Sequence, residues 1–213
     1  ALLVHGDYTL AFWLVVAAAV CDFFDGFTAR LLGCSSPIGV ELDSLADMVS
    51  FGLVPSLAMW TLFDAVPALG WLPAGFVEVG RYLTLVIVAF SALRLAKFNV
   101  DDTQHTEFCG LPTPANGLFC LSLGMLATGG YLPMFKEVVL IVAVVMACLL
   151  ISPIRMFALK FKGFGWRGNE LRYSFILLSV LIIALFTRYA IPTIIVIYVV
   201  LSFVRWITCR NRK

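Results

Sequence analysis

The feature that most constrains this chain is a series of long apolar segments. Residues 138–154, 174–187 and 189–204 contain no charged side chain. Over the whole chain, 62% of the 213 residues are hydrophobic and 13% are charged. A soluble domain of this length needs more charge to stay dissolved, whereas such runs are typical of helices that cross a lipid bilayer. The sequence therefore predicts an all-α fold, a polytopic helical membrane protein.

Hydropathy and helix-breaking residues predict seven membrane-spanning helices in a single domain, residues 1–213. The first helix ends at Gly33 and the second begins at Pro37, where Ser36 suits the N-cap and proline suits the first helical position. The first residues resemble the end of an earlier apolar segment, so we expect an eighth helix in the full-length protein. The predicted spans cover about residues 8–32, 37–62, 79–98, 114–131, 135–152, 171–187 and 190–208.

Lysine and arginine placement predicts how the chain lies in the membrane. With the turn at 33–36 in the cytoplasm and the spans alternating, 12 of the 15 basic residues lie at cytoplasmic ends. The other three are Arg81, Lys136 and Arg188. Cytoplasmic loops are enriched in basic residues, which favours this orientation. The loop at 155–172 mixes aromatic and basic side chains and is either an ordinary interfacial loop or a binding surface for anionic lipids. No partner of nucleic-acid type is expected.

Four aspartates lie where charge is most costly, on the two helices that flank the first predicted turn. Residues three or four apart share a helix face, so Asp22 and Asp25 line one side of the first helix. Asp43 and Asp47 line one side of the second. Asp22 and Asp47 are equally far from the turn, and Asp25 and Asp43 nearly so, which predicts two facing rungs of carboxylates. Glu41 points to another face and is not expected to be a ligand.

This cluster calls for counter-charge. One charge at such depth costs roughly a few kcal/mol, and like charges add repulsion. Arg30 is the only base nearby in the sequence, so two divalent cations are the expected partners. Oxygen ligands favour the hard metals Mg²⁺ or Mn²⁺ over zinc. The small residues Gly26, Ala29 and Gly39 either let the helices pack closely or leave an opening for a ligand beside the metals. Two metals in a membrane cavity suggest phosphoryl-group chemistry.

Two other interpretations of the acidic cluster stay open. The aspartates could be protonated and hydrogen-bonded within a helix bundle, without a metal. A divalent-cation transporter could use them as its permeation site, but it would be expected to carry carboxylates near the midplane in both halves of the chain. Here the last three predicted spans carry no acid within their apolar stretches, which favours an enzyme.

The spacing of these residues resembles a known signature. All eight fixed positions of the CDP-alcohol phosphatidyltransferase signature are present. They read Asp22-x-x-Asp25-Gly26-x-x-Ala29-Arg30, eight residues, and Gly39-x-x-x-Asp43-x-x-x-Asp47. Within that family, the segments 42–56, 92–100 and 110–117 resemble bacterial and archaeal phosphatidylserine synthases of the integral-membrane type.

The resemblance implies a reaction. In this family CDP-diacylglycerol lies with its acyl chains in the bilayer and its diphosphate at two metals. The hydroxyl of L-serine would attack the β-phosphorus and CMP would leave, in one direct displacement. Glycerol 3-phosphate or an inositol phosphate stays open as the acceptor. The resemblance also implies a homodimer in a prokaryotic cytoplasmic membrane, and the placement of basic residues puts the active site on the cytoplasmic side.

The resemblance assigns roles to the signature residues. Asp22, Asp25 and Asp43 would be metal ligands, and Asp47 would contact the second metal and act as general base on the serine hydroxyl. An aspartate is a weak base for an alcohol, so positioning must supply most of the rate. The residues implied in nucleotide binding are Asp22, Gly26, Ala29, Arg30 and Gly39.

The acceptor needs a site of its own. Arg94, Lys97 and Asn99 end the third predicted span on the cytoplasmic side, where the carboxylate of serine would pair with Arg94 or Lys97. Alternatively, these basic side chains only reach toward the membrane surface. Thr113, in the segment "GLPTPANG", would donate a hydrogen bond to the substrate or simply mark the start of a helix.

Overall fold

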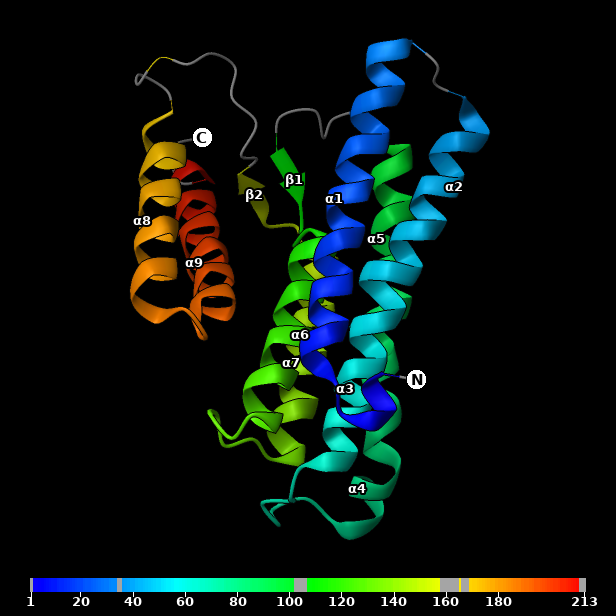
Figure 1. The fold of residues 1–213 in the computed structure, drawn as a ribbon, viewed down its shortest axis with the longest axis vertical. Coiled ribbons are helices and arrows are strands. Elements are labelled where there is room, and N and C mark those ends of the chain that lie inside the picture. Colours follow the sequence, from blue (N-terminus) through cyan, green and yellow to red (C-terminus); the bar gives the residue numbers. More distant parts are fainter. Residues whose placement is uncertain (1, 34–35, 102–106, 158–164, 166–168, 211–213) are drawn as a thin grey trace.

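The structure is a computed structural model, and it describes residues 2–33, 36–101, 107–157, 165 and 169–210. The part described is almost entirely helical (Figure 1), which confirms the predicted all-α class. After a short turn of helix, η1 (Leu3–His5), the helices are α1 (Tyr8–Leu32), α2 (Pro37–Asp47), η2 (Met48–Leu53), α3 (Val54–Ala65), α4 (Ala74–Gly80), η3 (Arg81–Leu85), α5 (Val86–Val100), α6 (Thr113–Thr128), α7 (Lys136–Leu150), α8 (Glu170–Phe186) and α9 (Ala190–Arg210).

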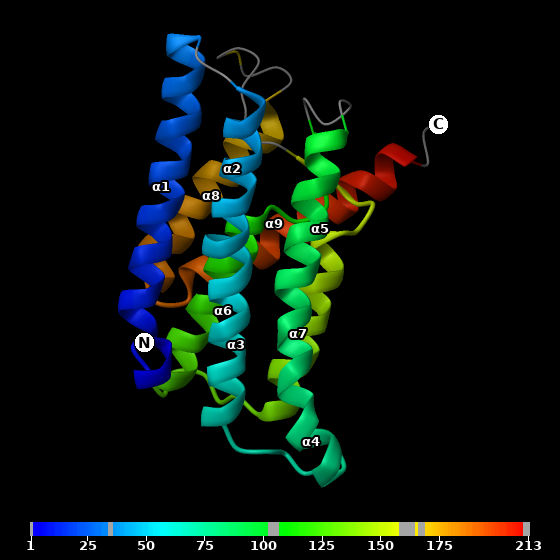
Figure 2. The ribbon, with the colours of Figure 1, turned by 90° about the vertical axis from the view of Figure 1, so that its right-hand side faces the viewer.

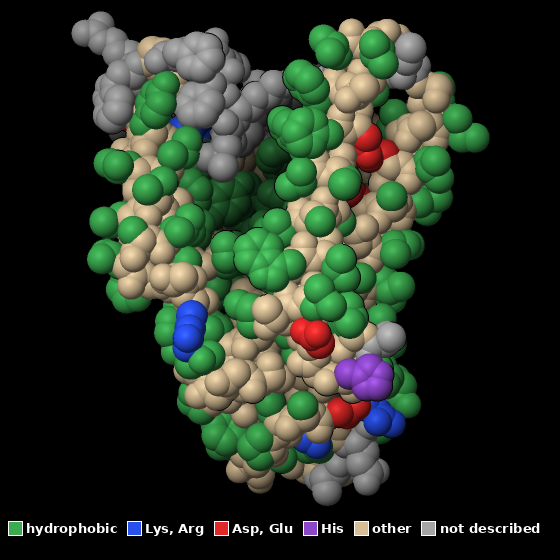
Figure 3. All heavy atoms as spheres, in the orientation of Figure 1, with side chains coloured by type: hydrophobic (Ala, Val, Ile, Leu, Met, Phe, Trp, Pro, Cys, Tyr) green, Lys and Arg blue, Asp and Glu red, His purple; other side chains and the backbone are tan. Residues whose placement is uncertain are grey.

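The helices match the seven predicted segments to within a few residues. Among the described residues, four stretches are long and apolar enough to cross a membrane: Tyr8–Ala29, Pro37–Ala65, Gly75–Val100 and Ala190–Thr208. The helices α6, α7 and α8 have 16, 15 and 17 residues, shorter than the roughly 20 that a bilayer requires. The fold is thus that of a helical membrane protein, and seven spans stay a prediction. Hydrophobic side chains cover much of its flank (Figure 3), as a lipid environment requires.

A short two-stranded ribbon is a feature that the sequence analysis did not predict. β1 (Glu107–Cys109) pairs antiparallel with β2 (Arg155–Phe157). β1 leads into α6 and β2 follows α7, so the ribbon lies at the upper ends of these two helices in Figure 1.

The ribbon connects the α8–α9 pair to the rest of the molecule. Phe157 is buried against Phe175 of α8 and Tyr198 of α9, with ring centroids 5.5 and 4.8 Å away. The Tyr198 hydroxyl also donates a hydrogen bond to the Phe157 carbonyl oxygen at 2.9 Å. Beside this connection, the face in Figure 3 is hollowed between the α8–α9 pair and α1.

The helices α1 and α2 form the predicted antiparallel hairpin. Gly33, directly after α1, has a φ of 64°, a left-handed conformation that suits glycine after a helix. At the start of α2, Ser36 Oγ accepts a hydrogen bond from Gly39 N at 3.1 Å, and Pro37 stands in the first turn. Both predicted helix ends are confirmed. The hairpin extends well past the upper ends of α6 and α7 (Figures 1 and 2).

The main core packs against the lower part of this hairpin and its continuation into α3. Tyr8, near the start of α1, is buried against Gly124 of α6, and its hydroxyl lies 2.8 Å from Thr61 Oγ1 on α3. The buried side chains of α1 and α3 in this core are Tyr8, Ala11, Phe12, Val15, Ala58, Met59, Leu62 and Phe63. By contrast, α2 has no buried residue, so the upper part of the hairpin stands outside the core.

Candidate active site

Three carboxylates meet between the upper halves of α1 and α2. One oxygen each from Asp22, Asp25 and Asp43 lies within 4.8 Å of the other two. Asp22 is half-buried and the other two are exposed. Oxygen ligands stand about 2.0–2.1 Å from Mg²⁺, so two ligands of one ion lie at most about 4.2 Å apart, and a small adjustment of these side chains would let them bind the same ion. The helices α1 and α2 therefore present an acidic group that fits a hard divalent cation, while Glu41 lies outside it, as predicted.

Asp47 lies one helical turn further along α2 and is not a member of that group of three. Its carboxylate interacts electrostatically with Asp22 and Asp43, and also with the Arg94 guanidinium of α5. Asp47 is thus within electrostatic range of both the acidic group and a basic side chain. Its predicted roles as ligand and base remain predictions.

The small residues of the signature lie near the acidic group. Gly26 and Ala29 are half-buried on α1. Gly39 is in the first turn of α2, where a Cβ would lie 3.1 Å from Ser36 Oγ. Glycine at this position therefore leaves room for the N-cap side chain, a local role that the sequence analysis did not consider. The Arg30 side chain is outside the described part of the structure, so the nucleotide-binding set stays a prediction.

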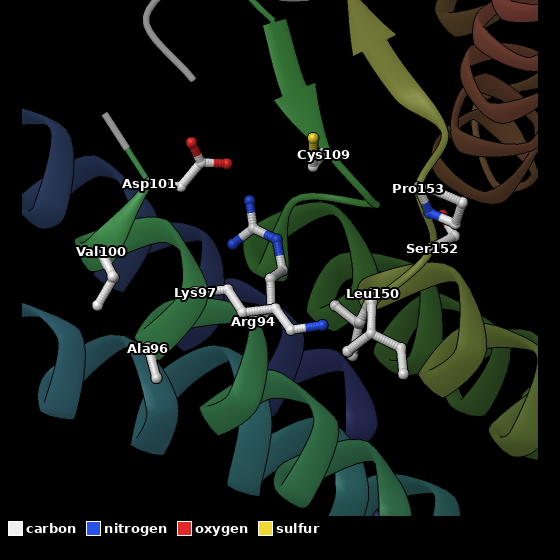
Figure 4. A pocket seen from close by; sticks show the side chains of 10 residues that line it. Arg94, Ala96, Lys97, Val100, Asp101, Cys109, Leu150, Ser152 and Pro153 are labelled. Atoms are coloured by element: carbon white, nitrogen blue, oxygen red, sulfur yellow. The ribbon is translucent and has the colours of Figure 1, made fainter. Parts of the chain in front are cut away.

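A cavity of about 710 Å³ opens at the upper end of α5 (Figure 4). Arg94 and Lys97 reach into it from α5, and Asp101 faces it from the end of the same helix. The residues around it come from the end of α5, from β1, and from the end of α7 with the segment that follows it. They are Arg94, Ala96, Lys97, Val100, Asp101, Cys109, Leu150, Ile151, Ser152 and Pro153.

Arg94 is the most deeply placed cation of this cavity. Its side chain is only 9% exposed, and its Nη1 donates a hydrogen bond to Thr113 Oγ1 at 3.4 Å. Within the described residues its Nε has no hydrogen-bond partner. Buried donors are normally satisfied, and a guanidinium pairs well with a carboxylate or phosphate. The cavity is therefore suited to an anionic group.

Of the four residues predicted to bind the acceptor, two line the cavity and two form hydrogen bonds with other side chains. Arg94 and Lys97 line the cavity, and Thr113 is fully buried and bonded to Arg94. Asn99 instead points to α2, where its Nδ2 donates to Ser44 Oγ at 2.9 Å. Direct substrate contact by Thr113 and Asn99 is thus less favoured than a supporting role.

Sequence reasoning missed several parts of the site. Asp101, Cys109 and Ser152 join the cavity only because β1 and the segment after α7 fold against the end of α5. No motif marks them. Ser44 could have been singled out from the sequence as a candidate site residue, because it lies between Asp43 and Asp47 on the same helix.

Comparison with known proteins agrees with this geometry. The sequence model of the CDP-alcohol phosphatidyltransferase family matches residues 1–151. A Helicobacter pylori protein (strain J99) named CDP-diacylglycerol–serine O-phosphatidyltransferase is 32% identical over 211 residues, covering 94% of this chain and 81% of that protein. The protein of that name in Bacillus subtilis is 38% identical over 120 residues, covering 56% of this chain and 62% of that protein. The protein of that name in Methanocaldococcus jannaschii is 33% identical over 108 residues, covering 51% of this chain and 47% of that protein. With its acidic hairpin and a match over most of its length, this chain belongs to the CDP-alcohol phosphatidyltransferase family.

Proposed function

We propose that this protein transfers the phosphatidyl group of CDP-diacylglycerol to the hydroxyl of L-serine, producing phosphatidylserine and CMP. It is a membrane-bound transferase of phospholipid biosynthesis. The observation that carries the proposal is the meeting of three carboxylates within 4.8 Å, beside a cavity that contains Arg94. The choice of serine is supported by the shared name of the matched relatives.

The proposed cofactors are two divalent cations, Mg²⁺ or Mn²⁺. Asp22, Asp25 and Asp43 would hold them, together with Asp47, and this oxygen-only donor set fits hard cations. When bound, the cations would neutralise the diphosphate and stabilise the charge on departing CMP.

Asp47 would accept the proton of the serine hydroxyl. It has electrostatic interactions with both the acidic group and Arg94. A serine bound beside Asp47 would direct its hydroxyl toward the diphosphate and its carboxylate toward the cavity. Because a carboxylate is a weak base for an alcohol, alignment of the two substrates would supply most of the rate.

The cavity has charges of both signs, as an amino acid acceptor requires. Arg94 and Lys97 would pair with the carboxylate of serine, and Thr113 would hold the guanidinium in place. Asp101, which faces the same cavity, suits the ammonium group. A phosphate-bearing acceptor would favour more cations and no carboxylate at this place, so the lining supports serine over glycerol 3-phosphate.

We further propose that the site faces the cytoplasm in a prokaryotic membrane. Arg81 of η3 and Lys136 of α7 belong to elements toward the lower end of Figure 1, and Arg188 lies in the turn at the lower end of the α8–α9 pair, whereas the adjoining ends of α1 and α2 and Arg155 of β2 lie toward the upper end. This separation supports the orientation predicted from basic residues. The resemblance alone supports a homodimer, and the pattern of apolar spans supports a single domain over 1–213. Anionic lipids at the 155–172 loop, much of which lies outside the described residues, are proposed from its basic and aromatic composition.

The direct test uses purified protein, radiolabelled CDP-diacylglycerol and Mg²⁺ or Mn²⁺. CMP release should require serine, and the product should be phosphatidylserine. Parallel reactions with glycerol 3-phosphate and an inositol phosphate test the alternative acceptors. CMP release with one of these and none with serine would reassign the acceptor. Metal uptake into liposomes without any lipid product would instead favour the transporter interpretation.

A further inference from the structure

We propose that the π-helical segment η2, Met48–Leu53, sets the rotation of α2 and so positions Asp43 and Asp47 toward α1. The proposal rests on the proposed function, in which these aspartates hold the cations. The helices α2, η2 and α3 form one continuous helical stretch, Pro37–Ala65, in which η2 follows Asp47 directly. Gly52 is the positioning residue, because its missing side chain is what lets η2 lie against Ser91 of α5.

Pro55 gives a physical reason for the π-helix. Proline has no backbone N–H, and in an α-helix its ring clashes with the carbonyl four residues earlier, which here belongs to Phe51. In the structure the turn before Pro55 is wider. The N–H of Val54 reaches back five residues to the Val49 carbonyl oxygen. Such single wide turns inside α-helices are rare and occur often at functional sites.

The wide turn changes the direction in which the aspartates point. Each residue of an α-helix turns the chain by about 100°, since one turn takes 3.6 residues. A segment with more residues per turn therefore leaves α2 rotated relative to an uninterrupted helix. α3 is fixed by side chains such as Met59 and Leu62, whereas α2 has no buried residue. The direction in which α2 faces is consequently determined by α3 through η2, together with the hydrogen bond from Asn99 of α5 to Ser44.

A close contact fixes η2 in place. A Cβ added to Gly52 would lie 2.9 Å from Ser91 Cβ and 3.3 Å from Ser91 Oγ on α5, so only glycine allows this approach. On α6, a Cβ added to Gly117 would lie 3.6 Å from Phe51 Cα, an ordinary contact. Both Phe51 and Gly52 are buried. η2 is thus held between α5 and α6, with no room for a side chain on the α5 side.

Asp22 and Asp25, on α1, are held in place by other contacts. α1 is anchored near Tyr8, through Thr61 and Gly124. A shift of η2 away from α5 would therefore move Asp43 and Asp47 while leaving Asp22 and Asp25 in place. The spacing of the carboxylates would change, although none of the ligands had been altered.

The test pairs a disruptive variant with its compensation. Gly52→Ala should push η2 away from α5, and Ser91→Gly removes both atoms within 3.4 Å of the new Cβ. We expect Gly52→Ala to raise the Kd for Mn²⁺ and lower kcat by about tenfold to a hundredfold, as small misplacements at a reacting centre do. In the double variant, the Kd for Mn²⁺ and kcat should both return to within about threefold of the wild-type values. Ser91→Gly alone should resemble the wild type. Gly80→Ala is the matched control. Its Cβ would also lie 2.9 Å from a neighbour, the flexible Leu140 Cδ1, far from the site.

A second measurement reads the geometry without catalysis. In a variant whose six cysteines are replaced, Asp22→Cys and Asp43→Cys should be joined efficiently by a short bis-methanethiosulfonate reagent. Adding Gly52→Ala should reduce the yield of the cross-linked product. Adding Ser91→Gly as well should restore that yield. Unchanged Mn²⁺ affinity and cross-linking in folded Gly52→Ala protein would overturn the proposal, as would failure of Ser91→Gly to rescue. If the wild type binds no Mn²⁺ and releases no CMP while cross-linking responds as expected, the proposed function fails and the positioning role stands.

Discussion

Asn99 on α5 donates a hydrogen bond from Nδ2 to Ser44 Oγ on α2, at 2.9 Å. Ser44 is the residue after Asp43, and Asn99 lies two residues after Lys97. The bond therefore joins α2, the helix that carries Asp43 and Asp47, to α5, the helix that carries the cations of the cavity. It keeps the two halves of the proposed active site in register.

Loss of this bond should slow the reaction without unfolding the protein. A hydrogen bond of this kind contributes about 0.5–1.5 kcal/mol. We expect Asn99→Ala and Ser44→Ala each to lower kcat/KM for serine by roughly threefold to tenfold. Because both variants remove one interaction, the double variant should lose little more, which a double-mutant cycle measures. Additive losses would show that the two side chains act independently.

Removal of an aspartate from the acidic group should abolish metal binding and turnover together. Asp22→Ala and Asp43→Ala each take one oxygen ligand from the group of three. We expect no measurable CMP release and no saturable Mn²⁺ binding by calorimetry. Glu41→Ala is the matched control, since Glu41 is an exposed carboxylate of α2 outside the group. Mn²⁺ binding of normal affinity in Asp43→Ala would contradict its assignment as a ligand.

Asp47→Asn should impair chemistry more than nucleotide binding. The amide keeps the shape of the side chain but cannot accept the proton of the serine hydroxyl. General-base contributions are typically about 10²–10⁴-fold, so we expect kcat to fall at least about a hundredfold. KM for CDP-diacylglycerol should change only severalfold. Steady-state kinetics with labelled lipid separates the two effects, and wild-type turnover would show that Asp47 is not the base.

Changes at the cavity should act on the acceptor. Arg94→Gln removes a buried guanidinium, whose hydrogen bonds to an anion are worth about 1.5–3 kcal/mol. We expect KM for serine to rise by roughly tenfold to a hundredfold, with KM for CDP-diacylglycerol nearly unchanged. Asp101→Asn should raise KM for serine to a smaller extent, since Asp101 is only half-buried. Equal effects on both substrates would place Arg94 at the lipid diphosphate instead.

Stability should depend on a buried carboxylate at the other end of the molecule. Glu137 of α7 is fully buried, and its two oxygens accept hydrogen bonds from Leu69 N and Gly70 N at 2.8 and 2.9 Å. In Glu137→Gln one acceptor becomes a donor that faces another donor. We expect a loss of about 1–3 kcal/mol and a lower Tm in detergent, with KM values unchanged.

Asp64→Asn provides the comparison for Glu137→Gln. Asp64 is an exposed carboxylate at the same end, 3.9 Å from Arg81, and surface pairs of this kind contribute about 0–1 kcal/mol. Its Tm should stay close to that of the wild type. A drop as large as that of Glu137→Gln would mean that the two loop hydrogen bonds are not the cause.

Much of the fold followed from local patterns. The helix ends at Gly33 and Ser36 were predictable because glycine and serine act there through contacts within a few residues. The meeting of Asp25 with Asp43 followed from helical periodicity and one short turn, but Asp22 was expected opposite Asp47 and instead joins the same group. The wide turn before Pro55 was not predicted, although the proline stood within the expected span. A proline in a helix can cause a kink, a break or a π-turn, and neighbouring helices select among them.

The sequence by itself determined that the chain forms apolar helices and that its acidic residues face one another across a hairpin, because both depend on spacing along neighbouring segments. Only the tertiary structure decided that Arg94 shares a cavity with Ser152, that Asn99 binds Ser44, and that Gly52 lies against Ser91. These relations join residues far apart in the chain. They depend on how each helix is rotated about its axis, which core packing determines and residue spacing does not.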